Sequence, residues 1–155
     1  MTVTQEIAAT IKAALAALVP TTVTRYVDGM PETVQTGTVV YADGVADTAG
    51  EDVDREKLPC VAIVVSECLP QQYRSVLRAY PVVIEAATWQ PEDTFQFALY
   101  ELAAVINPWL CEPSLSLTLS HFDALTVESE PEYGIIGRVQ YVRWMGSCKT
   151  RKATA

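Results

Sequence analysis

The residues best suited to catalysis are Ser120, His121 and Asp123, which follow one another closely in the chain. A serine beside a histidine and an acid could act as a nucleophile with its general base. Neighbours at positions i and i+2 of a strand do not form a triad by themselves, so a surface histidine at a strand end is the favoured interpretation. The chain also contains no GxGxxG, Walker, GxSxG or HExxH motif. We therefore predict no catalytic residue, no enzyme activity and no bound cofactor.

The cysteines offer little for metal binding. Cys60, Cys68, Cys111 and Cys148 include no CxxC pair, and His121 is the only histidine. A structural zinc site needs four thiolate or imidazole ligands, usually in closely spaced pairs. We predict no metal site, and we expect buried free thiols rather than disulfides.

Acidic residues are concentrated between residues 42 and 57, in the sequence ADGVADTAGEDVDREK. Calcium binding would be the chemical use of such a stretch. The EF-hand loop needs acids at alternate positions, a central glycine and a closing glutamate, and the spacing here differs. A long solvated loop that becomes ordered against a partner is the favoured prediction. Its acids are Asp43, Asp47, Glu51, Asp52, Asp54 and Glu56.

Glu85 is the one acid inside an otherwise apolar stretch, residues 80–89. If its side chain is buried, it needs a cationic partner, for which Arg78 and Arg143 are the candidates. If it lies on a solvent face, it needs none.

Composition and charge bound the class of protein. The 155 residues suit one domain, and 50% apolar against 19% charged residues predicts a folded chain. No apolar run approaches the roughly 20 residues of a membrane helix, so we expect a soluble protein made in a cytoplasm. The net charge of −8 argues against general nucleic-acid binding, which needs clustered lysine and arginine.

The C-terminal end is basic. No acid follows Glu132. The cations that follow it are Arg138, Arg143, Lys149, Arg151 and Lys152. We place a single α+β domain at residues 1–148 and a basic tail at residues 149–155. This tail is either a solubilising end of the chain or, through Lys149, Arg151 and Lys152, a contact with an acidic neighbour.

Hydrophobic periodicity predicts the elements of the first third of the chain. Apolar residues recur at helical spacing after Thr4, a plausible N-cap, until Pro20 ends the helix. Residues 22–44, rich in valine and threonine, predict two strands joined at an Asp-Gly turn.

The rest of the chain predicts a sheet with a second helix. Apolar residues 58–69 and 76–89 predict a strand pair joined by a short hairpin connection. Residues 91–106 form a helix that begins at a proline. Leucine and serine or threonine alternate over residues 114–120, which predicts a half-buried strand, and after a turn at EPEYG a last strand covers residues 138–144. The order of elements predicts an α+β fold, with a mainly antiparallel sheet and two principal helices packed on it.

The second helix is apolar on more than one side, and after Asp93 its only charge is Glu101. Such a helix is buried on more than one face. Either the first helix covers its second face or another copy of the chain does, in which case the helix is an assembly surface. The residues predicted for that subunit interface are Phe97, Leu99, Tyr100, Val105 and Trp109.

This layout resembles the tail-terminator, or tail-completion, proteins of long-tailed bacteriophages. The matching parts are QEIAATIKAALAAL, the strand pair LPCVAIVVSEC and RAYPVVIEAATW, the helix PEDTFQFALYELAAVI and the terminal strand GRVQYVRWMGSC. They cover nearly the whole chain. The resemblance lies in the order and general sequence character of the elements, because the family has no sharp motif.

The resemblance implies a structural virion protein in the tail or neck. Six copies would form a ring that closes the tail tube and meets the head connector or stopper, with the sheath as a further neighbour in a contractile tail. Acids of the stretch 43–56 facing the channel would let DNA pass without specific binding. Another neck or head-completion protein is the alternative, followed by a small-ligand-binding α+β module or enzyme.

Overall fold

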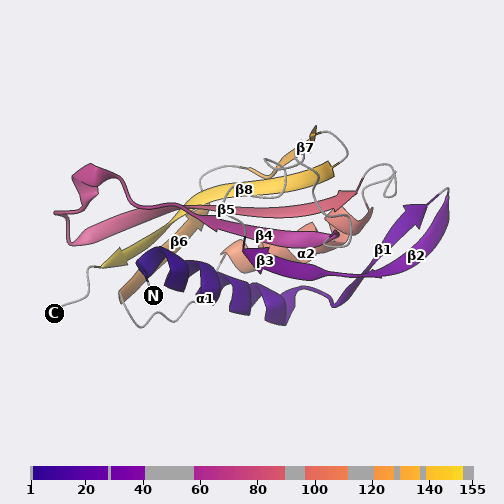
Figure 1. Cartoon of the computed structure of the whole chain (residues 1–155), viewed down its shortest axis with the longest axis horizontal. Helices are drawn as coiled ribbons and strands as arrows, with labels where there is room; N and C mark the ends of the chain where they lie inside the picture. Colours follow the sequence, from indigo (N-terminus) through magenta and orange to yellow (C-terminus); the bar gives the residue numbers. More distant parts are fainter. Residues whose placement is uncertain are drawn as a thin grey trace.

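The computed structural model describes residues 2–27, 29–40, 58–89, 97–111, 121–127, 130–136 and 139–151. These residues form an α+β fold in which two helices pack on a mainly antiparallel sheet, as the sequence predicts. In Figure 1 the N-terminal helix runs below the main sheet, the second helix overlaps part of the sheet in this view, and a separate two-stranded hairpin extends beyond the right-hand end of the sheet.

Helix α1, Val3–Leu18, has its N-cap two residues earlier than the cap predicted from the sequence. Thr2 is its N-cap, and a capping box joins Thr2 to Gln5. Ile7, Ile11 and Leu15 form the stripe that the periodicity predicts, and all three are fully buried against the sheet. The helix is thus fixed by its first turn and by one apolar face.

The main sheet has the strand order β3-β4-β5-β8-β6, with β7 also paired to β8. Its strands are β3 (Gly37–Val40), β4 (Cys60–Val65), β5 (Leu77–Trp89), β6 (His121–Val127), β7 (Glu132–Ile136) and β8 (Val139–Arg151). Only β3 runs parallel to its neighbour, β4. The long strands β5 and β8 pair along their full length and form the centre of the sheet.

Strand β8 has two partners along its other edge. Its first part, Val139 to Arg143, pairs with β7, whereas its later part, Gly146 to Arg151, pairs with β6. Gly146 lies where the second pairing begins, and a Cβ atom there would stand 2.1 Å from the carbonyl oxygen of Thr126. The glycine therefore permits the close approach of β6.

Residues alternate between the two faces of the sheet. One row across β4, β5 and β8, on the face toward the helices, consists of Val61, Ala86 and Val142. The adjacent row, Ala62, Glu85 and Arg143, faces the opposite side. Both α1 and α2 (Phe97–Cys111) contribute to the core on the first face. A smaller buried cluster around Cys60 and Tyr141 lies on the second.

Two antiparallel hairpins reach opposite ends of the molecule (Figure 1). Strands β1 (Thr22–Val27) and β2 (Met30–Gln35) form the separate hairpin, and Gly29 of its turn has a φ of 78°. This confirms the predicted strand pair, although β3 was not expected as a third strand. At the other end, β4 and β5 are joined by a connection that contains a 3-10 helix, Pro70–Gln72.

The prediction for the C-terminal third needs correction. The sequence EPEYG is not a turn, because its last residues begin β7, and the chain reverses between Ile136 and Val139 instead. The last strand runs to Arg151 rather than to Trp144. Lys149 and Arg151, predicted to lie in a basic tail, are therefore sheet residues, and the strand predicted at residues 114–120 lies outside the described residues.

Candidate subunit-contact surfaces

The exposed face of α2 is the first candidate surface. Leu99 and Ile106 belong to the side of the helix buried on the sheet, and Leu99 is only 1% exposed. Leu99 was predicted as an interface residue, and this is wrong because the fold of a single chain already buries it. Val105 and Trp109 are half-buried. The exposed face carries no charge, and its members are Tyr100, Ala104, Asn107, Pro108 and Cys111.

An aromatic pair joins this helix face to β7. Tyr100 is 52% exposed, and its ring lies 5.9 Å from that of Tyr133, centroid to centroid, at an interplanar angle of 56°. Partial burial raises the pKa of the Tyr133 phenol, and the neighbouring Tyr100 adds to the rise. Ile135, two residues further along β7, is also exposed. Together these side chains form an apolar surface of the kind that marks protein contacts.

A hollow of about 430 Å³ lies beside this surface. It lies between the end of α2, β6, the approach to β7 and β8, and its lining residues are Asn107, Leu110, Cys111, Leu125, Thr126, Val127, Pro131 and Trp144. We call it the α2–β6 hollow. The Trp144 indole donates a hydrogen bond of 2.7 Å to the Asn107 side-chain oxygen, which fixes the ring in the wall.

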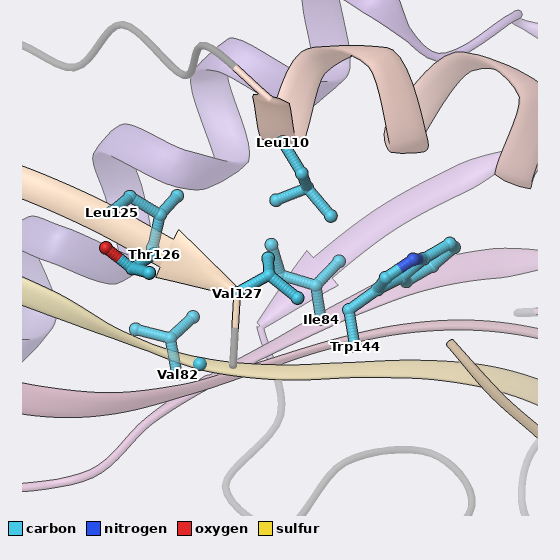
Figure 2. A pocket seen from close by; sticks show the side chains of 8 residues that line it. Val82, Ile84, Leu110, Leu125, Thr126, Val127 and Trp144 are labelled. Atoms are coloured by element: carbon cyan, nitrogen blue, oxygen red, sulfur yellow. The ribbon is translucent and has the colours of Figure 1, made fainter. Parts of the chain in front are cut away.

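A smaller apolar cavity of about 10 Å³ lies beneath the hollow. Figure 2 shows Leu110 pointing from α2 toward Val127 and Ile84, with the Trp144 ring beside them. Leu110, Leu125 and Val127 line both spaces, so the α2–β6 hollow has an apolar part beside the polar Asn107 and Thr126.

The second candidate surface consists of residues 69–77, the later part of the connection between β4 and β5 together with the first residue of β5, and we call it the hairpin tip. Its exposed apolar residues are Leu69, Tyr73, Val76 and Leu77, and Val76 is 71% exposed. Arg78 braces the tip, because its guanidinium donates to the Tyr73 carbonyl oxygen and lies 5.5 Å from the centre of the Tyr73 ring. The hairpin tip is therefore an apolar protrusion with a fixed conformation, and it lies at the left-hand end of Figure 1.

The two surfaces differ in charge. Arg151 pairs in register with Leu77 and Lys149 with Ala79, so the cations at the end of β8 lie beside the hairpin tip, which itself carries Arg74. Glu67, which accepts a hydrogen bond from Thr4, is an exposed acid at this end. Beside the α2–β6 hollow, Glu130 is an exposed acid next to Pro131 of the lining. Glu132 is also exposed, but it pairs in register with Arg143 and therefore lies on the opposite face of the sheet.

Glu85 has the partner that the sequence suggested for a buried acid. It is 1% exposed and accepts a hydrogen bond of 2.8 Å from Nε of Arg143, its cross-strand neighbour on β8. The Arg143 guanidinium also lies 4.9 Å from the centre of the Tyr141 ring. Glu85 is therefore a structural residue, because its charge is paired with Arg143 and buried in the sheet.

The predictions about cysteines are largely confirmed. Cys60, Cys68, Cys111 and Cys148 are not joined in disulfides, and Cys60, Cys68 and Cys148 are buried. Burial raises the pKa of the Cys148 thiol to about 12. Cys111 is exposed at the end of α2, contrary to the expectation that the cysteines would be buried.

Within the described ranges, no group of three or more histidine, cysteine, aspartate or glutamate side chains is placed to hold a metal ion. Among the helices that the structure describes, none has the length and apolar character needed to span a membrane.

Other predicted site residues lie outside the described residues. These are the acids of the stretch 43–56, Lys152 and Ser120, and also the side chains of Phe97, His121 and Asp123.

The hairpin tip and β7 were missed as surfaces. The sequence PQQYRSV did contain a signal for the tip, because a tyrosine and a valine within a polar connection have no strand partner to cover them. The mistaken turn at EPEYG concealed Tyr133.

No protein-family model matches this chain, and no curated protein matches it.

Proposed function

We propose that this chain is a structural virion protein that forms a ring at the end of a bacteriophage tail tube and joins the tail to the head connector. The observation that carries the proposal is the presence of two unlike exposed apolar surfaces in opposite halves of the molecule (Figure 1). Contacts between two different surfaces of identical chains form rings when the rotation closes. A ring-forming protein needs two such surfaces.

The order of elements gives further support to this proposal. The N-terminal helix, the antiparallel pair β4–β5, the helix α2 across the sheet and the terminal strand β8 follow the order of the parts that resemble tail-terminator proteins. In that role the partners are further copies of the chain, the tail tube protein, the connector or stopper and, in a contractile tail, the sheath. DNA passes through the ring, and the protein is made in the host cytoplasm.

Electron microscopy of tail tubes tests this function. Gene neighbourhood identifies the tube protein to use, since tube and tape-measure genes should lie beside this one. Purified chain added to tubes is expected to appear as a ring at one end of each tube. Bare tube ends at every protein concentration, together with binding to isolated connectors, would favour another neck protein instead.

The α2–β6 hollow favours a second candidate function, a small-ligand-binding module. Its volume of about 430 Å³ lies in the range of ligand pockets, and Asn107 offers a polar group beside an apolar part of the lining. A fragment screen by NMR would test it. Micromolar binding that shifts the Trp144 indole signal would favour this candidate, whereas only millimolar, unselective binding would count against it.

A further inference from the structure

We draw no further inference here: the strongest candidate, the α2–β6 hollow with its apolar residues beside Asn107, belongs to the surfaces already described, and nothing in the part of the chain that the structure describes shows what covers it.

Discussion

The two halves of β8 perform different tasks on the same strand. In the half beside β7, Arg143 is tied to the buried Glu85, and the neighbouring surface is aromatic and acidic. In the half beside β6, Lys149 lies at the level of the hairpin tip, in basic surroundings. Arg143 stabilises the fold, whereas Lys149 is available for contacts with other chains. The two cations therefore have different roles on the same strand.

A chain with a net charge of −8 can therefore present unlike surfaces to copies of itself. The half-buried Arg143 is paired with the buried acid Glu85, and the exposed cations Arg74 and Arg151 lie at the end of the hairpin tip together with the exposed acid Glu67. A head-to-tail assembly joins unlike surfaces of neighbouring copies, so such a cationic end can meet a differently charged surface.

The largest loss of stability is expected from substituting a buried residue beneath the Tyr100–Tyr133 surface, rather than an exposed residue on that surface. Leu99→Asp should lower the free energy of unfolding by at least about 4 kcal/mol, because it buries an unpaired charge. Tyr100→Asp, one position away and exposed, should cost about 1 kcal/mol through the lost ring contact with Tyr133. Urea denaturation of both variants measures the difference. Equal losses would show that the exposed face of α2 is part of the core.

Removing the buried partner of Arg143 should have the next largest effect. Glu85→Ala should destabilise the fold by about 3 kcal/mol, because the arginine is left without its main partner. Lys149→Ala is the matched change in the other half of β8, and it should cost less than about 0.5 kcal/mol. Thermal unfolding compares the two variants. A similar loss of stability in both variants would contradict the assignment of Arg143 as a structural cation and Lys149 as a contact cation.

Substitutions at two glycines test whether the two halves of β8 differ in packing. In Gly146→Ala the new Cβ would meet the backbone of β6, and we expect a loss of about 2 kcal/mol. In Gly134→Ala it would meet the end of the Tyr141 side chain, which can move, so about 1 kcal/mol is expected. Chemical denaturation measures both losses. A larger loss at Gly134 would mean that the β7 half is the more tightly packed one.

The smallest effect concerns the thiols. At pH 8 an alkylating reagent should modify Cys111 within minutes and leave the other three cysteines intact, because these are buried and the Cys148 pKa is raised to about 12. Mass spectrometry counts the modified thiols. Folded burial of Cys148 favours its protonated form, so its contribution to stability is present below pH 9 and is lost as the pH rises toward 12. Rapid labelling of Cys148 in the folded chain would contradict this assignment.

Much of the fold was predictable because it depends on local periodicity. The stripe Ile7, Ile11 and Leu15 and the apolar runs of β4 and β5 indicate their elements without any knowledge of partners. The turn at EPEYG was mispredicted because proline and glycine are frequent in turns, whereas here Gly134 lies within β7, beneath Tyr141. What a strand residue faces depends on register, which local sequence does not contain.

The contact surfaces were only partly predictable for the same reason. Tyr100 was identified because helical spacing shows that α2 has apolar residues on a second side. Leu99 was misassigned, since spacing alone does not tell which apolar side meets the sheet. The hairpin tip and the α2–β6 hollow combine residues from distant segments, so they become visible only once β8 brings Trp144 beside Asn107.

The most direct test of head-to-tail assembly is the mass of the purified protein in solution, measured by light scattering over a range of concentration with and without tail tubes. The chain has a mass of 17.0 kDa. Our account predicts a closed ring of more than two copies, formed alone at high concentration or on the tubes. A species that stops at two copies, or a monomer indifferent to tubes and connectors, would contradict it.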